Sequence, residues 1–127
     1  MKRNNDLIRE ILLIAEAHTD EDKMLEVTPA DFIKEFSNIT QYEIDEHVRL
    51  LKEKGLIETH HNRGGWYIKR LTWDGHDFLG NARDITVWNQ AKQIAATSSW
   101  DVFSSVLKEF ALKGAMLMLK QSIGYNL

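Results

Sequence analysis

The stretch from Thr28 to Leu71 constrains the fold of this chain most, because it combines helix starts, a helix stop and a hairpin. The run Thr40-Gln41-Tyr42-Glu43 is a capping box, in which the hydroxyl and the carboxylate each satisfy a backbone donor at the start of a helix. Gly55 ends that helix, since glycine readily adopts the left-handed conformation just beyond a helix C-terminus. We therefore expect a capped helix that leads directly into the strands that follow.

The next residues predict a two-stranded hairpin. Leu56 to His60 and Trp66 to Leu71 are rich in strand-forming residues, and His61 to Gly65 supplies turn chemistry between them. Strand alternation places Trp66 and Ile68 on one face, with Tyr67 and Lys69 on the other. In the preceding helix we expect three apolar side chains to turn inward, namely those of Ile44, Val48 and Leu51.

Two helices are expected before the capping box. Apolar residues at helical spacing predict an amphipathic helix from Asn5 to Ala17. Thr28-Pro29-Ala30-Asp31 then predicts a short helix to Phe36 or Ser37, capped by Thr28 and favoured by Pro29 in its first turn. The acidic stretch between these helices is expected to be a loop, with a short strand at Met24 to Val27 left open.

The rest of the chain is expected to be helical. Thr72 can cap a helix that either ends or continues toward Ala96, and Ser98 with Asp101 opens a last helix. The apolar residues carried by the first of these are Phe78, Leu79, Ala82, Ile85 and Trp88, and those expected to form one face of the second are Phe103, Val106, Leu107, Phe110, Gly114 and Leu117. We assign residues 1–90 to one domain and residues 91–127 to a helical extension, which is either part of the same compact unit or a dimer interface.

Three helices followed by a glycine-tipped hairpin resemble the winged-helix proteins, in which the third helix often enters the DNA major groove. Ile44 to Ile57 resembles the recognition helix, glycine stop and first wing strand of small bacterial repressors of that fold. The expected fold class is mainly α with a small β-hairpin (α+β), a winged helix-turn-helix domain with a C-terminal helical extension.

A resemblance that spans nearly the whole chain is to a bacterial and prophage-associated family, domain of unknown function 2513. The matching pieces are Met1-Lys2-Arg3 with Asp6-Leu7-Ile8-Arg9, and Arg70 to Leu79 continuing to Trp88-Asn89. This resemblance implies a winged-helix fold and a phage or mobile-element setting. It supplies no site residues to carry over.

Charge is distributed unevenly along the chain. The net charge is −3, so attraction to nucleic acid must come from local patches. Thr59 to Arg70 carries basic residues and no acid. From Glu16 to Glu46, by contrast, only Lys23 and Lys34 are basic, and the acids are Glu16, Asp20, Glu21, Asp22, Glu26, Asp31, Glu35, Glu43, Asp45 and Glu46.

Two hypotheses follow from this distribution. In the first, the protein is a non-enzymatic DNA-binding regulator, and its candidate contact residues are Lys2, Arg3, Arg63 and Lys69 for phosphates, with Gln41, Tyr42 and Arg49 for bases. In the second, the acidic face of the second and third helices binds a basic protein, and no DNA is bound. The carboxylates of Asp45 and Glu46 favour the second hypothesis, because phosphates would repel them.

The sequence indicates no enzyme, cofactor or metal site. His60 and His61 are adjacent on an expected strand and therefore point to opposite faces, which opposes joint metal ligation. Gly75-His76-Asp77 has no serine elbow or phosphate-binding glycine loop beside it, so Asp74 is interpreted as a first-turn acid and Gly75 as a close-packing position. His47 is expected to be a packed, hydrogen-bonded histidine.

Self-association and a cytoplasmic location are also expected. The last helix is apolar on several sides, and its candidate dimer or partner residues are Trp100, Phe103, Leu107, Phe110, Met116, Leu117 and Met118. The chain has no cysteine, which fits a reducing cytoplasm. No apolar run approaches the roughly 20 residues that span a bilayer, and acids interrupt the apolar stretch after Met1-Lys2-Arg3, so we expect a retained helix there and no membrane partner.

Overall fold

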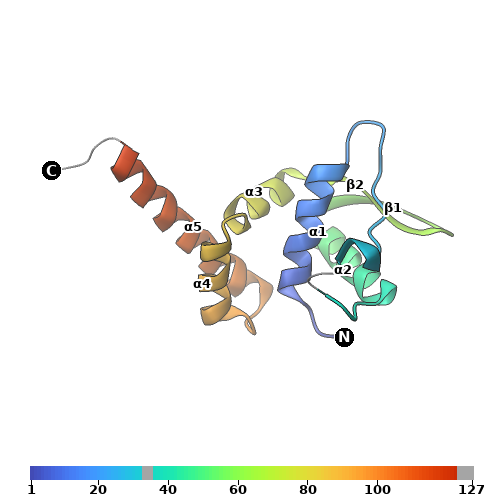
Figure 1. The fold of residues 1–127 in the computed structure, drawn as a ribbon, viewed down its shortest axis with the longest axis horizontal. Helices are drawn as coiled ribbons and strands as arrows, with labels where there is room; N and C mark the ends of the chain where they lie inside the picture. The colour runs from blue at the N-terminus through green and yellow to red at the C-terminus, as the bar shows by residue number, and fades with distance from the viewer. Residues whose placement is uncertain (33–35, 123–127) are drawn as a thin grey trace. The chain divides into compact units, whose positions relative to one another are not determined.

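A computed structural model describes residues 1–32 and 36–122, and the chain divides into two compact units (Figure 1). The first unit is Met1–His76 and the second is Asp77–Leu127. The division therefore lies earlier in the chain than the predicted boundary at residue 90. Each unit is described by itself.

Helix α1 (Asn5–His18) forms the first side of the core of the first unit. The Asn4 side chain accepts a hydrogen bond from the Leu7 backbone N–H and so caps the helix. One face of α1 is fully buried, through Leu7, Ile8, Ile11, Leu12 and Ala15. The predicted amphipathic helix is confirmed, with one more residue at its end.

In the described residues between α1 and α2, the chain forms two isolated β-bridges and one short helix, and the first bridge joins Asp20 to Lys23. Leu25 forms an isolated β-bridge with Ile68, with hydrogen bonds of 2.9 and 2.8 Å. The short helix is the 3₁₀ helix η1 (Pro29–Phe32), where the Asp31 carboxylate accepts from the Thr28 backbone N–H at 2.8 Å. Pro29 therefore does start a helix, but its described part is 3₁₀, and Phe36 and Ser37 are not helical. The rest of the predicted helix, residues 33–35, lies outside the described residues.

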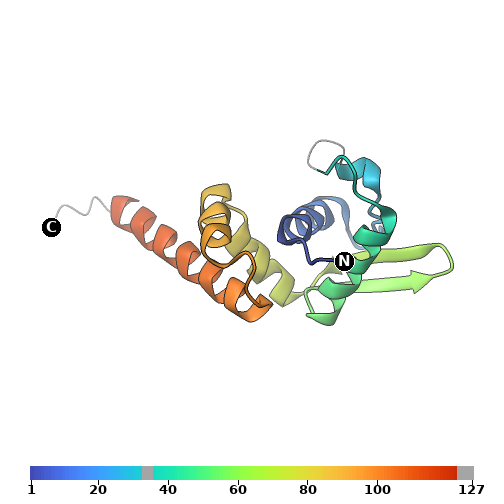
Figure 2. The same cartoon turned by 90° about the horizontal axis from the view of Figure 1, so that it is seen from below.

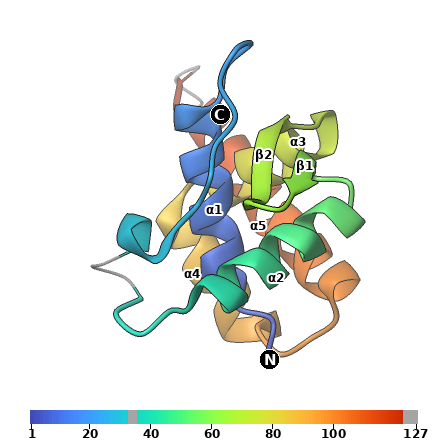
Figure 3. The ribbon, with the colours of Figure 1, turned by 90° about the vertical axis from the view of Figure 1, so that its right-hand side faces the viewer.

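Helix α2 (Gln41–Glu53) begins and ends as its sequence predicts. The Thr40 hydroxyl accepts from the Glu43 backbone N–H at 3.2 Å, and Gly55 has a φ of +71°. Ile44, Val48 and Leu51 are at most 2% exposed, which confirms the predicted inward face. Figure 3 shows α2 beside α1, and the two helices contact each other and the hairpin.

Strands β1 (Ile57–Asn62) and β2 (Gly65–Leu71) form the predicted antiparallel hairpin. Pairing runs from Ile57 opposite Leu71 to Asn62 opposite Gly65, with a register shift between Glu58 and Thr59. This irregularity allows Ile68 and Leu71, three positions apart, both to be buried. The hairpin projects away from α1 and α2 (Figure 2).

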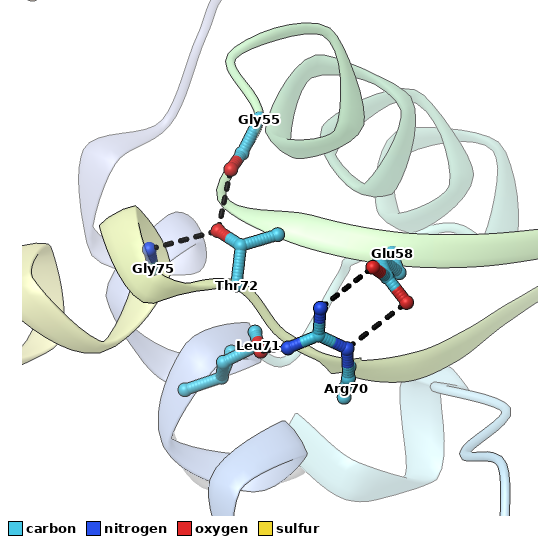
Figure 4. Close-up of polar contacts among 6 residues, drawn as sticks. All are labelled: Gly55, Glu58, Arg70, Leu71, Thr72 and Gly75. Atoms are coloured by element: carbon cyan, nitrogen blue, oxygen red, sulfur yellow. Dashed lines mark hydrogen bonds and ion pairs between the residues drawn. The ribbon is translucent and has the colours of Figure 1, made fainter.

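Hydrogen bonds of Thr72 connect the start of helix α3 (Trp73–Ala82) to Gly55, just after the end of α2. The Thr72 hydroxyl donates to the Gly55 carbonyl and accepts from the Gly75 backbone N–H at 3.1 Å (Figure 4). A Cβ at Gly75 would lie 2.0 Å from the Leu56 carbonyl oxygen, so this glycine is a close-packing position, as predicted.

The second unit contains most of α3 with helices α4 (Ile85–Ala95) and α5 (Trp100–Ser122). The helix predicted from Thr72 breaks at Asp84, whose carboxylate accepts from the Thr86 and Val87 backbone N–H groups at 2.8 and 3.2 Å. Ile85 is the first residue of α4 and is 54% exposed. The core is built from aromatic contacts among Phe78, Trp88, Trp100 and Phe103.

Helix α5 starts one residue later than predicted, because Ser99 and not Ser98 accepts from the Val102 backbone N–H. The protein is thus mainly helical with a small antiparallel hairpin, an α+β fold as predicted. Among the described residues, no helix is both long enough and apolar enough to cross a membrane.

Candidate nucleic-acid interface

On the side that faces α2, the hairpin carries two stacked aromatic rings, and a lysine ammonium group lies over one of them. His61 and Trp66 are cross-strand partners with stacked rings, 4.3 Å between centroids and 22° between planes. The Lys52 ammonium of α2 lies 5.4 Å from the Trp66 ring centroid, within range of a cation–π interaction. We call these three residues, with Arg63 at the turn, the wing cluster. It joins an exposed positive charge to aromatic faces, a combination suited to phosphates and nucleic-acid bases.

Arg63 occupies the turn that connects the strands. The Asn62 side chain accepts from the Gly64 backbone N–H at 2.7 Å, and Gly65 takes a φ of +120°, which favours glycine. Arg63 is exposed, and among the described residues no side chain pairs with its guanidinium. The turn therefore presents a cation at the projecting end of the hairpin.

Two of the three predicted base contacts on α2 are held by acids of the same helix. The Gln41 amide donates to the Val27 carbonyl and to the Asp45 carboxylate, both at 3.0 Å. Arg49 donates to the Glu46 carboxylate, and this ion pair raises the pKa of the Arg49 guanidinium. Both must exchange an intramolecular partner before they can contact a base.

Tyr42, the third predicted base contact, is 64% exposed at the N-terminal end of α2. Its ring is presented to solvent by the first turn of the helix. All three predicted base contacts are exposed, and among the described residues Tyr42 is the one whose side chain is not held by an intramolecular hydrogen bond.

The N-terminal residues are fixed to α2 through a buried histidine. The Asn4 backbone N–H donates to His47 Nε2 at 2.8 Å, and His47 Nδ1 lies 2.7 Å from the Glu43 carbonyl oxygen. Because an N–H can only donate, Nε2 must be the acceptor, so His47 is neutral with its proton on Nδ1. Burial lowers the pKa of His47 below its ordinary value of 6.5. This contact holds the chain just after Lys2 and Arg3 against α2, and both residues are exposed.

Lys69 and Arg70 lie in acidic surroundings. Arg70 forms a two-pronged ion pair with the Glu58 carboxylate at 2.7 and 3.0 Å (Figure 4), which lowers the pKa of Glu58. Lys69 lines an open pocket of about 590 Å³ whose acidic residues are Glu16, Asp20, Glu21, Asp22 and Glu58. Lys69 therefore lies apart from the wing cluster.

The histidines of the hairpin are used in ring contacts. His61 stacks on Trp66, while His60 is tilted against Tyr67 with 6.5 Å between ring centroids. Across residues 1–32 and 36–122, no group of three or more His, Asp or Glu side chains is arranged to hold a metal ion.

The candidate partner residues of α5 fall into two groups. Phe103 and Leu107 are fully buried in the core of the second unit, and Trp100 and Phe110 are half-buried. By contrast, three of the candidates are about half or more exposed: Met116, Leu117 and Met118.

Of the wing cluster, only Arg63 was among the predicted contact residues, and the cation Lys52 was missed together with His61 and Trp66. Lys52 lies three positions after Arg49, so helical spacing places both on one face of α2. That spacing was a usable signal for a second cation on this face. Its position over the Trp66 ring required the packing of helix against hairpin.

The arrangement defines a class of protein: a small α+β domain in which a capped helix and a basic hairpin form one exposed surface, followed by a helical unit. Residues 2–101 match the family described as "Hypothetical protein (DUF2513)", and the chain belongs to this family. It is similar to an "Uncharacterized protein" of Haemophilus influenzae, 36% identical over 115 residues that cover 87% of this chain and 92% of the relative. No solved structure matches.

Proposed function

We propose that the first unit is a winged-helix module that binds duplex DNA without catalysing a reaction. The observation that carries this proposal is the wing cluster, in which cations from α2 and from the hairpin turn adjoin a stacked aromatic pair. Lys2 and Arg3 add positive charge beside α2. DNA as the partner implies action in the cytoplasm, and we propose that the protein acts as a homodimer, which presents two such modules.

The wing supports the proposal better than α2 does. In many winged-helix proteins the third helix contacts bases, and α2 is the third helix of this chain after α1 and η1. In α2, however, Glu46 forms an ion pair with Arg49, and Asp45 accepts a hydrogen bond from Gln41. The carboxylates would be repelled by phosphates in a groove. We therefore propose that the hairpin and the N-terminal residues supply most of the affinity, and that α2 contributes Lys52 and Tyr42 at its exposed face.

A titration of generic duplex DNA against salt concentration tests this proposal. The four cations Lys2, Arg3, Lys52 and Arg63 predict a slope of log Kobs against log salt of about −3 to −4, since each phosphate contact contributes about −0.9. Absence of binding at low ionic strength would contradict the proposal.

The acidic residues favour a second function, in which the first unit binds a basic protein and no DNA. The ion pair of Glu46 and the acidic pocket beside α1 and β2 are the observations behind it. Polylysine serves as the probe in fluorescence anisotropy. Binding of polylysine together with no binding of DNA at low salt would favour this second function over the first.

A further inference from the structure

Helix α5 carries a row of exposed apolar side chains along its second half. Leu112, Met116 and Leu119 are 60%, 49% and 54% exposed. Their spacing of four and then three residues places them on one face of the helix, which we call the seam. In Figures 1 and 2 this part of α5 extends beyond α4.

The opposite face of α5 holds the helix in its own unit. Phe103 and Leu107 are fully buried, and the Phe103 ring packs edge-on against Trp88 at 5.2 Å between centroids. Farther along, a Cβ at Gly114 would lie 3.9 Å from the Val87 side chain. The seam is therefore a second apolar face, separate from the face that builds the core.

Charges of opposite sign flank the seam on the same side. Glu109 and Lys120 are eleven positions apart, about three turns of an α-helix, so they project in nearly the same direction. The midpoint between them falls between Gly114 and Ala115, the small residues of this stretch. Another cation on this side, that of Lys113, lies 5.9 Å from the Phe110 ring centroid.

We propose that the seam binds the seam of a second copy of this chain, with the two α5 helices antiparallel. A two-fold axis opposite the Gly114–Ala115 midpoint places Glu109 level with the partner's Lys120, and Lys120 level with the partner's Glu109. In a parallel pair, Glu109 would lie opposite the partner's Glu109, and Lys120 opposite the partner's Lys120, so like charges would face each other. The charge pattern is thus complementary to itself only when one helix is reversed.

With the same two-fold axis, the apolar side chains of the two copies interdigitate. Leu112 lies on one side of the midpoint, and Met116 and Leu119 lie on the other, so the reversed partner fills the spaces along the seam. Ala115, the small residue of the midpoint that lies nearer to the seam, allows the helices to approach closely. The seam residues and their spacing therefore fit a second copy without any further element.

This inference specifies the dimer of the proposed function, and its test contains no DNA, so the two can fail separately. Light scattering at micromolar concentration is expected to give twice the monomer mass of 14.7 kDa. Met116→Glu is expected to raise the dimer Kd at least tenfold, because it introduces two like charges into the seam. A wild-type monomer at these concentrations would overturn the inference.

The control for Met116→Glu is Ile94→Glu, which changes an apolar residue of α4 that is 65% exposed and lies outside the seam. Ile94→Glu is expected to leave the dimer unchanged. A dimer that survives Met116→Glu, or that is lost equally in both variants, would overturn the seam as the interface.

A charge exchange tests the antiparallel register with surface substitutions alone. Glu109→Lys and Lys120→Glu should each weaken the dimer several-fold, because each places like charges opposite one another. The double variant should restore the wild-type Kd, since both pairs are then rebuilt in reverse. Failure of the double variant to recover would overturn the antiparallel pairing, because within one chain the two residues are too far apart to interact.

Discussion

At the scale of single residues, the junction between the hairpin and α3 depends on an approach that only glycine permits. The Leu56 carbonyl accepts from the Thr72 backbone N–H at 3.0 Å, and the backbone of Gly75 passes directly over the same carbonyl. The Thr72 hydroxyl connects the two sides by contacting both Gly55 and Gly75 (Figure 4). Backbone contacts of this kind cannot relax by rotation of a side chain, so substitution here must move a main chain.

Gly75→Ala is therefore expected to lower the free energy of unfolding by about 2 kcal/mol or more, the cost of overpacking against backbone. Gly80→Ala in the same helix is the control, because nothing lies within 4 Å of a Cβ there. That change should stabilise the protein by about 0.5–1 kcal/mol through helix propensity. Urea unfolding followed by circular dichroism measures both. Equal effects of the two substitutions would show that the contact with Leu56 is unimportant.

His47 gives the first unit a dependence on pH. Its neutral form accepts from Asn4 and is buried, so the pKa of His47 is lower in the folded protein than in the unfolded chain. The unfolded state consequently binds the proton more readily, and stability that is complete above about pH 6.5 should decrease as the pH falls below that value. Glu43 and Glu46 oppose this effect and Arg3 adds to it.

Urea midpoints at pH 7.5 and pH 5.5, for the wild type and for His47→Gln, measure this contribution. The decrease in stability should be larger in the wild type, because the other titrating groups are common to both proteins. His60→Gln is the control, since His60 is exposed. A decrease of the same size in His47→Gln and wild type would assign the pH dependence to other groups.

At the scale of elements, caps and glycines were the reliable sequence signals. The Thr40 cap and the Gly55 stop define α2, and Asn62 to Gly65 forms the turn of the hairpin. These features depend on neighbours within a few residues, which is why a single sequence discloses them. The α+β fold class followed from them.

Features that depend on distant partners were missed or only partly predicted. The register shift near Thr59 reflects how β2 must bury both Ile68 and Leu71, and the bridge at Leu25 needs β2 as its partner. At the candidate site, Arg63 was found from its turn, but the position of Lys52 over Trp66 comes from packing between α2 and the hairpin. Asp45 and Glu46 lie at helical spacing from Gln41 and Arg49, so the sequence indicated that these side chains are neighbours. It did not indicate which acid pairs with which residue.

The break between α3 and α4 shows a local signal that was overlooked. Asp84 caps α4 through two backbone N–H groups. Of the two alternatives in the sequence analysis, one helix or a break before Ala96, the cap therefore corresponds to the break. Asp84→Ala should lower the free energy of unfolding by about 1 kcal/mol. Asp84→Asn should leave the free energy of unfolding close to that of the wild type, since asparagine also caps well. Thermal or urea unfolding of the two variants measures the difference. An Asn variant as unstable as the Ala variant would contradict the capping role.

At the scale of the whole molecule, the wing cluster and the seam belong to different units. The first unit carries the exposed cations of the wing cluster and of the N-terminal residues, although the net charge of the chain is −3. The second unit carries the exposed seam of α5. We therefore expect DNA binding and self-association to be separable by substitution.

The salt dependence of DNA affinity in wing-cluster variants tests the central proposal most directly. Lys52→Ala and Arg63→Ala should each reduce the magnitude of the slope by about 0.9 without unfolding the protein. Lys108→Ala, an exposed lysine of α5 outside the wing cluster, is the matched control and should leave the slope unchanged. The assignment of DNA binding to the wing cluster would be contradicted if the slope of log Kobs against log salt were the same in all of these proteins. It would also be contradicted if Lys108→Ala reduced the slope as much as Lys52→Ala and Arg63→Ala do.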